Sequence, residues 1–288
     1  MPELPEVETV RRGLTELTLG ETIRGGDVLR SRTIAHPVSA VDFLAALEGC
    51  AIAFWHRRGK YLLAQLHRPS ANSSHTPGGW LGVHLRMSGQ LLWLHPQEAL
   101  QKHTRVRIFC TGDRELRFVD QRTFGKMWWV PPHTAPETII TGLAKLGPEP
   151  LSPDFSPDTL RHALHHRRRP IKTALLDQSI IAGLGNIYAD EALFLSGIAP
   201  TQLCSDLTPT DIDRLHHSII QVLQEAIAAG GTTFSNFLNL LGVNGNYAGV
   251  AWVYNRTGQP CRRCSTPIQR LKLAGRSTHF CPHCQPQG

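Results

Sequence analysis

Residues 261–284 read CRRCSTPIQRLKLAGRSTHFCPHC and contain two Cys-x2-Cys pairs, Cys261/Cys264 and Cys281/Cys284. The 16 residues between the pairs suit a β-hairpin. Four thiolates at this spacing satisfy tetrahedral Zn²⁺ with no open position, so we expect one structural zinc ion. The alternative is two unrelated pairs, or cysteines that serve redox chemistry.

The sequence around this module is basic. After Glu225 the chain has no acidic residue, and it has six basic ones: Arg256, Arg262, Arg263, Arg270, Lys272 and Arg276. The whole chain of 288 residues has 30 Lys and Arg against 23 Asp and Glu, a net charge of +7. A basic segment that is also folded favours a polyanionic partner such as nucleic acid. At the expected hairpin tip, beside Gly275, Arg276 fits a phosphate contact better than a plain surface arginine.

The chain before the zinc module has a helical pattern from about residue 148. Ser156-Pro157 and Thr208-Pro209 are typical helix starts, and the second opens an apolar stripe that ends at Gly230-Gly231. A glycine-rich turn at residues 183–186 lies between two helical runs. Its backbone N–H groups suit a phosphate, and an ordinary helix C-cap is the alternative. The Pro-rich stretch 131–157 is the expected linker.

Residues 22–130 instead contain short runs with β-strand character. The clearest runs are residues 60–66, 89–94, 104–109 and 115–119. Many short strands at this spacing predict a sandwich or a barrel. A short helix is expected before them at residues 5–14, and the segment 67–79, rich in Ser, Pro, Gly and Asn, looks like an insertion between two strands.

Cysteine usage and hydropathy indicate the compartment. No apolar run approaches the ~18 residues that span a bilayer, and the acidic start is unlike a signal peptide. Seven cysteines are an odd number, and Cys50, Cys110 and Cys204 stand apart from the two pairs. This pattern favours metal binding in a reducing compartment over disulfides. We therefore expect a soluble cytoplasmic protein, and the sequence gives no sign of an oligomer, so a monomer is expected.

The chain begins MPELPEVET. Methionine before proline is normally removed, which would leave Pro2 with a secondary amine, and an α-amino group has an unperturbed pKa of about 7.7–8.0. Such an amine can attack a sugar C1′ atom and give an iminium cation, which is an electron sink for eliminating the 3′ and then the 5′ phosphate. Glu3 and Glu6 lie three residues apart and could move protons there. Taken alone, these residues favour a Pro-rich helix entry with acids at its N-terminus.

Four motifs together resemble formamidopyrimidine-DNA glycosylase. They are MPELPEVET at the start, GLGNIYADEALF at 183–194, GGTT at 230–233 and the four-cysteine module. The resemblance runs from end to end with the motifs in order. It implies an α+β fold with two lobes: an N-terminal β-sandwich with flanking helices, and a C-terminal lobe that holds a helix–two-turn–helix and a zinc ribbon. DNA would lie in the cleft between the lobes.

The resemblance also implies an activity and a domain division. The expected enzyme is a bifunctional glycosylase and AP lyase of base excision repair, acting on 8-oxoguanine and ring-opened purines in double-stranded DNA by β,δ-elimination. The expected parts are a catalytic β-sandwich domain at residues 1–147, a helical DNA-binding domain at 148–254 and a zinc ribbon at 255–288. Residues 230–254 resemble the loop that closes over the everted base.

The family's catalytic positions match residues at the start of this chain. Pro2 matches the nucleophile, Glu3 matches the acid/base that opens the deoxyribose, and Glu6 matches a supporting carboxylate. Three further positions match contacts to the DNA backbone. Lys60 matches the β-hairpin lysine that contacts phosphate beside the lesion, Lys172 matches a phosphate lysine before the helical motif, and the match makes the turn at Asn186 a DNA clamp.

A base in a duplex must be everted before a nucleophile can reach its sugar, and inserted side chains can offset the unstacking cost. Met87, Arg122 and Phe124 match the three residues with which the family fills the gap. The alternative is that Met87 and Phe124 lie in the core. The family often carries proline and a second arginine where this chain has Gln121 and Thr123. This difference puts the stiffness of the loop and one nearby positive charge in doubt.

Two alternative functions compete with this interpretation. An endonuclease VIII-type glycosylase shares the fold and the Pro2 chemistry but prefers oxidised pyrimidines. Such proteins begin with a motif similar to MPEGPE and lack the Met/Arg/Phe trio. Leu4 and the trio in this chain therefore favour oxidised purines as substrates. The other alternative is a zinc-ribbon DNA-binding protein without catalysis, against which Pro2 and Glu3 argue.

Overall fold

The computed structural model describes residues 1–69, 76–232 and 247–286. Part of the expected insertion at 67–79 and most of the expected lesion-capping loop within 230–254 lie outside these residues. The described chain forms two compact units. The first contains residues 1–144 and 230–232, and the second contains residues 145–229 and 247–286. The further division of the second unit at residue 254 stays a prediction.

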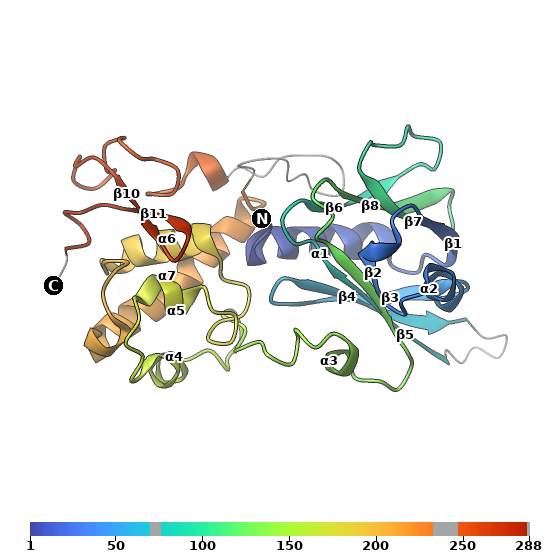
Figure 1. Cartoon of the computed structure of the whole chain (residues 1–288), viewed down its shortest axis with the longest axis horizontal. Helices are drawn as coiled ribbons and strands as arrows, with labels where there is room; N and C mark the ends of the chain where they lie inside the picture. The colour runs from blue at the N-terminus through green and yellow to red at the C-terminus, as the bar shows by residue number, and fades with distance from the viewer. Residues whose placement is uncertain (70–75, 233–246, 287–288) are drawn as a thin grey trace. The chain divides into compact units, whose positions relative to one another are not determined.

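The first unit is built on two β-sheets (Figure 1). The first sheet has the order β1-β7-β8-β6, and all its neighbours are antiparallel. Its strands are β1 (Ile23–Val28), β6 (Gly89–Leu94), β7 (Thr104–Cys110) and β8 (Arg114–Asp120). The second has the order β2-β9-β5-β4-β3, in which only the β2/β9 pair is parallel. Its strands are β2 (Ile34–His36), β3 (Ala51–Arg58), β4 (Tyr61–Arg68), β5 (Thr76–His84) and β9 (Lys126–Val130).

Side-chain alternation explains why the two sheets share one core. In β7 the side chains of Val106, Ile108 and Cys110 are buried, and those between them are partly exposed. This period of two places one face of the strand on the core. The core cluster contains residues from both sheets, and Trp55 and Phe118 are among its largest fully buried side chains. The expected β-sandwich is therefore confirmed.

Three helices accompany these sheets: α1 (Leu4–Thr18), α2 (Ala40–Leu47) and α3 (Pro136–Ile139), with a 3₁₀ turn η1 (Ser31–Thr33). Helix α1 is longer than the expected residues 5–14. It continues past Gly13 because Leu14 and Thr18 are buried, and the Thr18 hydroxyl accepts a hydrogen bond of 2.9 Å from Trp55 Nε1. The expected linker is also partly structured, since it contains α3.

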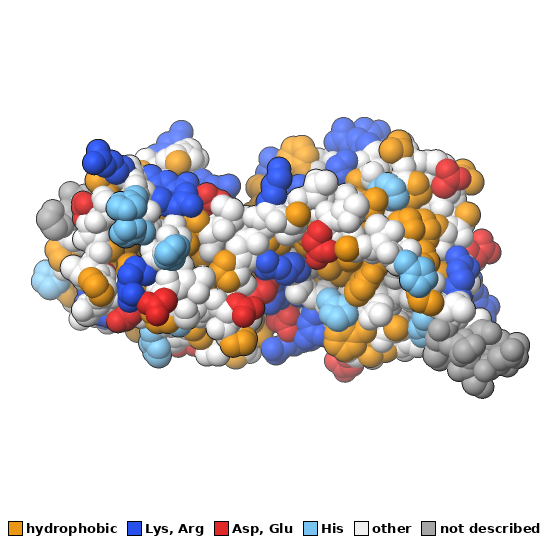
Figure 2. Space-filling model, turned by 90° about the horizontal axis from the view of Figure 1, so that it is seen from below, with side chains coloured by type: hydrophobic (Ala, Val, Ile, Leu, Met, Phe, Trp, Pro, Cys, Tyr) orange, Lys and Arg blue, Asp and Glu red, His pale blue; other side chains and the backbone are white. Residues whose placement is uncertain are grey.

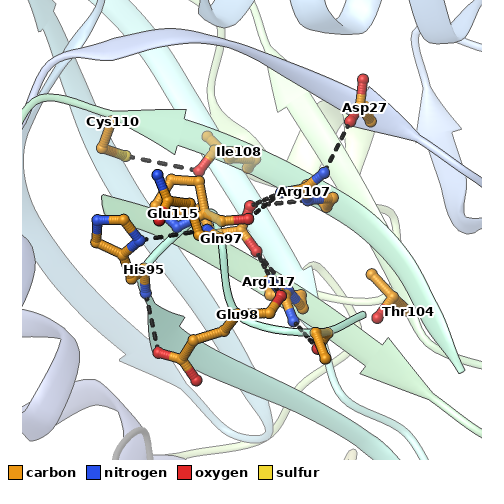
Figure 3. Close-up of polar contacts among 12 residues, drawn as sticks. Asp27, His95, Gln97, Glu98, Thr104, Arg107, Ile108, Cys110, Glu115 and Arg117 are labelled. Atoms are coloured by element: carbon orange, nitrogen blue, oxygen red, sulfur yellow. Dashed lines mark hydrogen bonds and ion pairs between the residues drawn. The ribbon is translucent and has the colours of Figure 1, made fainter. Parts of the chain in front are cut away.

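The outer face of the first sheet carries a buried ionic network (Figure 3). Glu115, fully buried, lies between two arginines: it accepts a hydrogen bond of 2.8 Å from Arg107 Nε and pairs with Arg117. The Arg117 guanidinium also donates to the carbonyl oxygens of Glu98 and Ala99, at 3.1 and 3.0 Å. These bonds fasten the loop after β6 to strand β8, whose last residue is Asp120.

The second unit is mainly helical. Its helices are α4 (Pro157–Leu164), α5 (Ile171–Leu175), α6 (Asn186–Ser196) and α7 (Pro209–Ala228), with 3₁₀ turns η2 (Cys204–Asp206) and η3 (Tyr247–Gly249). Both helix starts expected from the sequence are confirmed, because Ser156 and Thr208 accept from the backbone N–H three residues later. The unit ends in the hairpin of β10 (Gln269–Leu273) and β11 (Arg276–Phe280). In the described parts of the chain, no helix has the length and apolar composition needed to cross a membrane.

Candidate active site and DNA-binding surface

The start of α1 brings the expected catalytic carboxylates together. Glu3 is the N-cap of the helix, and Glu6 is three residues further on. The Glu3 backbone N–H donates to Glu6 Oε2 at 2.7 Å, while the Glu3 side chain accepts from the Glu6 backbone N–H. This capping box fixes both carboxylates beside Pro2. Each glutamate is only 2% exposed, and Pro2 is buried.

The second oxygen of Glu6 binds the GGTT motif. Glu6 Oε1 accepts a hydrogen bond of 2.8 Å from the Thr232 backbone N–H. Gly231 has φ of +79°, and a Cβ atom there would lie 3.1 Å from Glu6 Oε1. This close approach explains why the motif needs glycine. Glu6 therefore links the start of α1 to residues far away in the sequence.

Lys60 lies in the two-residue turn between β3 and β4, next to Gly59. Gly59 has a positive φ of +54°, whereas the φ of Lys60 is not positive. This combination is typical of a type II′ hairpin turn, in which glycine takes the first central position. Lys60 is 7% exposed, so the turn is not a freely exposed strand end.

His84 at the end of β5 is a neutral histidine in this neighbourhood. Burial and, to a smaller extent, the positive charges of Arg86 and Lys60 together lower the pKa of His84 to about 3. Its Nδ1 atom accepts a hydrogen bond of 3.0 Å from the Arg86 backbone N–H, and its ring meets the Tyr61 ring edge-on at 4.5 Å. The neutral imidazole therefore orients the residues just before Met87.

This neutral histidine should make the stability of the protein sensitive to mild acid. The pKa of His84 is lower in the folded than in the unfolded state, so its contribution is complete above about pH 6.5. The contribution is lost as the pH falls toward 3, at no more than about 1.4 kcal/mol per pH unit.

His84→Asn keeps an acceptor for the Arg86 N–H but does not titrate. We expect this variant to lose less melting temperature than the wild type between pH 7 and 5. An equal loss in both proteins would show that His84 is not buried in the neutral form.

The three expected wedge residues lie on the surface. Met87 is 40% exposed, Phe124 is 49% exposed, and Arg122 is also exposed. The Arg122 guanidinium lies 5.1 Å from the centre of the Phe124 ring. Exposure of two large apolar side chains argues against a core role and leaves them available to a partner.

A buried carboxylate holds together the two loops that carry Met87 and the Arg122–Phe124 pair. Asp120 accepts a hydrogen bond of 2.5 Å from the Ser88 hydroxyl and one of 2.8 Å from the Gly125 N–H. The Ser88 hydroxyl in turn accepts from the Arg122 N–H at 2.9 Å. The loop is therefore braced by Asp120, although it lacks the proline that the family often carries at Gln121.

Arg32 restores a positive charge beside Thr123. Its guanidinium donates to the Thr123 hydroxyl and to the Thr123 carbonyl oxygen, the latter at 3.3 Å. Lys126 Nζ donates to the carbonyl oxygen of Arg32 at 2.5 Å. The second arginine of the family motif is absent, but a cation from the η1 turn lies beside Thr123.

In the second unit, two of the expected DNA contacts meet on the zinc hairpin. Asn186 Nδ2 and Lys172 Nζ donate to the same Ser277 carbonyl oxygen, at 3.1 and 3.0 Å. Lys172 is only 1% exposed, and its Nζ lies 2.5 Å from Asp190 Oδ1. A direct phosphate contact would need this ion pair to open, so that role of Lys172 stays a prediction. Arg276 begins β11 and is exposed.

The four cysteines form the expected metal site. Their sulfur atoms all lie within 4.8 Å of one another. The Cys261–Cys284 and Cys264–Cys281 sulfur distances are 3.9 and 3.4 Å. A tetrahedral Zn²⁺ with Zn–S bonds of about 2.3 Å places its sulfurs about 3.8 Å apart, so the residues fit the ion. Backbone N–H groups of Arg263 and Cys284 point at Cys261 and Cys281 sulfurs, at 3.4 Å each, as suits thiolates.

Sequence reasoning missed two buried acids in the GLGNIYADEALF motif. Asp190 Oδ2 accepts from the His279 backbone N–H at 2.9 Å. Glu191 accepts from the backbone N–H groups of residues 252, 253 and 254, at 2.6 to 2.9 Å. Burial raises the pKa of Glu191, and these three bonds oppose that effect. The two acids fasten the segment before the zinc hairpin and the hairpin itself to α6. The only sequence signal of this role is the presence of two adjacent acidic residues in a mostly apolar helix.

Comparisons with known proteins agree with this architecture. Family models match in order along the chain: the formamidopyrimidine-DNA glycosylase N-terminal domain at residues 1–127, the H2TH domain of the same glycosylase at 146–237, and a zinc finger found in FPG and IleRS at 258–287. The formamidopyrimidine-DNA glycosylase of Trichodesmium erythraeum is 64% identical, over 99% of this chain and 100% of the relative. That of Nostoc punctiforme is 66% identical, over 99% of this chain and 96% of the relative.

Solved structures are similar over the whole chain. A Lactococcus lactis FPG variant in complex with a Fapy-dG containing DNA has a TM-score of 0.88 and 35% identity, covering 99% of this chain and 100% of that one. The MutM (FPG) protein of Thermus thermophilus has a TM-score of 0.86 and 38% identity, covering 100% of both chains. With its β-sandwich, helical unit and four-cysteine hairpin, this chain belongs to the formamidopyrimidine-DNA glycosylase family of DNA-repair enzymes.

Proposed function

We propose that this DNA glycosylase removes oxidised purines, 8-oxoguanine and formamidopyrimidines, from double-stranded DNA and then cleaves the damaged strand as an AP lyase. The observation that carries the proposal is the start of α1, where two buried glutamates are fixed within one helical turn of Pro2. The enzyme acts as a cytoplasmic monomer with one structural zinc ion. Its catalytic residues are Pro2, Glu3, Glu6 and Lys60.

The nucleophile is the Pro2 nitrogen, which becomes an amine when Met1 is removed. Its lone pair attacks C1′ of the damaged nucleotide, the bond from C1′ to the base breaks, and the proton that the amine loses goes to the departing base. Glu3 gives a proton to the ring oxygen of the sugar, so that the ring opens and an iminium cation forms. Loss of a C2′ proton expels the 3′ phosphate, a second elimination expels the 5′ phosphate, and water then releases the sugar fragment from Pro2.

Glu6 keeps this arrangement in place. One of its oxygens binds the Glu3 N–H and the other binds the Thr232 N–H. Both donors are backbone N–H groups, so the Glu6 side chain joins two separate segments of backbone. Glu6 therefore orients the nucleophile's helix start, while Lys60 binds a phosphate beside the lesion.

The DNA partner is supported by charge and by the relatives. The chain has 30 Lys and Arg against 23 Asp and Glu, and Figure 2 shows several separate groups of Lys and Arg side chains on the face drawn, with Asp and Glu side chains also present. Lactococcus lactis Fpg has been solved in complex with DNA that contains an abasic site. In this chain we assign phosphate contacts to Lys172, Asn186 and Arg276, and zinc holds the hairpin that carries Arg276.

The wedge trio fills the gap that the everted nucleotide leaves. Phe124 enters between base steps, Met87 occupies the vacated space, and Arg122 donates hydrogen bonds to the orphaned base. Arg122→Ala should therefore lose discrimination by the base opposite the lesion, because one bidentate base contact contributes about 1–3 kcal/mol. Single-turnover rates on 8-oxoguanine opposite each of the four bases measure this. An unchanged order of preference would remove the role assigned to Arg122.

Matched duplexes that differ only in the lesion test the proposed substrate. One contains 8-oxoguanine and the other thymine glycol, and base release and strand cleavage are followed separately. The proposal predicts faster release of 8-oxoguanine, with phosphate at both ends of the resulting gap. Faster thymine glycol release would assign the enzyme to oxidised pyrimidines. Base release without strand cleavage would contradict the lyase activity.

A further inference from the structure

A cluster of four charged side chains links α1 to the β3–β4 hairpin. Glu8 lies in α1, two residues after Glu6, and is largely buried. Its Oε1 atom accepts from Arg11 Nη2 at 2.8 Å and from Arg12 Nε at 3.0 Å. Its Oε2 atom lies 3.1 Å from Arg57 Nε, near the end of β3. One carboxylate thus binds three guanidinium groups from two elements.

Arg57 carries this link into the turn that holds Lys60. While its Nε donates to Glu8, its Nη1 donates to the Gly59 carbonyl oxygen at 3.1 Å. That carbonyl belongs to the peptide unit that joins Gly59 to Lys60, the central peptide of the two-residue turn. Type I′ and type II′ turns differ mainly in the orientation of this peptide. A donor fixed on the Gly59 oxygen therefore selects one orientation and with it the direction of Lys60.

Glu8 stays ionised at neutral pH, so its ion pair with Arg57 is maintained there. Burial alone would raise the pKa of Glu8, but hydrogen bonds and charges from Arg11, Arg12 and Arg57 lower it to about 2. The carboxylate is ionised throughout the neutral range. Arg57 is well suited to the second contact because its planar fork offers donors in two directions, which a lysine ammonium on a flexible stem does not.

We infer that Glu8 and Arg57 are positioning residues, which set Lys60 relative to the helix that begins beside Pro2, Glu3 and Glu6. The inference rests on the proposed function, since it gives Lys60 a place in the reaction. Neither Glu8 nor Arg57 needs to touch DNA. They act through the Gly59–Lys60 peptide, and their contribution to the rate exists only while Lys60 is present.

A double-mutant cycle between Arg57→Met and Lys60→Ala tests this directly. Single-turnover base release from an 8-oxoguanine duplex is measured with enzyme in excess. Arg57→Met should slow the wild type by roughly tenfold to a hundredfold, the range for a misplaced group near a reacting centre. In the Lys60→Ala background the same change should slow release by less than about twofold. An equal loss in both backgrounds would overturn the inference.

Two further variants and the wild-type enzyme complete the test. Arg57→Lys retains the charge without the fork, so it should be slow like Arg57→Met and serves if the Met variant folds poorly. A rate equal to the wild type would show that charge alone matters and would also overturn the inference. Arg12→Met, whose side chain is 60% exposed and binds Glu8 without reaching the turn, is the matched control with less than about twofold effect. Absence of a borohydride adduct with wild-type enzyme would instead contradict the proposed function itself.

Discussion

Enzyme carrying Pro2→Gly should lose the covalent adduct that borohydride traps on 8-oxoguanine duplexes, by on the order of 10²-fold or more. A glycine amine gives an imine that must be protonated before it withdraws electrons, whereas the proline adduct is permanently cationic. Glycine also removes the ring that is buried at the start of α1. The yield of trapped adduct under single-turnover conditions measures the effect.

A proline at the start of another helix provides the control for this variant. Pro209 occupies the first turn of α7 and has no assigned role in the reaction. Pro209→Ala should trap within about twofold of the wild type, because proline is merely favourable at this position. Full trapping by Pro2→Gly, or by enzyme with a blocked amino terminus, would assign the nucleophile to another residue.

Cys261→Ser should have the second large effect, on DNA binding. Loss of one thiolate opens the zinc site, and structural zinc contributes directly to folding in modules of this kind. We expect duplex affinity to fall by about tenfold or more, since Arg276 and Ser277 lie on the hairpin that the metal closes. Fluorescence anisotropy gives the affinity, and metal analysis gives the zinc content.

The first unit should be unaffected by this change. Its core cluster contains no residue of the hairpin, so its thermal transition should remain. Cys204→Ser is the matched control, because Cys204 is buried in the same unit as the hairpin but lies outside the sulfur cluster. Normal DNA affinity in a zinc-free Cys261 variant would contradict the role assigned to the metal.

Local sequence signals predicted most of the fold. Helix starts at Ser156 and Thr208 follow from short-range capping chemistry, and the strands of the sandwich follow from short runs of residues with β-strand character. The two Cys-x2-Cys pairs predicted the metal site because a tetrahedral metal ion constrains the spacing of its cysteine ligands along the chain. Glu3 and Glu6 could be placed together because both lie within one helical turn.

Contacts between residues far apart in the sequence could not be predicted. The bond from Thr232 to Glu6 and the Glu8–Arg57 pair join segments that only the folded chain brings together. The same holds for Arg32 beside Thr123, where the sequence showed a missing arginine but not the nearby cation from another segment. The ion pair that buries Lys172 against Asp190 could not be predicted either, and the phosphate contact that the family match implies for Lys172 stays a prediction.

Mass spectrometry of the borohydride-trapped complex tests the central claim most directly. After digestion of protein and DNA, the peptide that carries the sugar fragment is sequenced. We predict that the fragment sits on the nitrogen of Pro2 and that Met1 is absent from that peptide. Fully active enzyme that retains Met1, or a fragment attached to a lysine such as Lys60, would contradict the proposed mechanism.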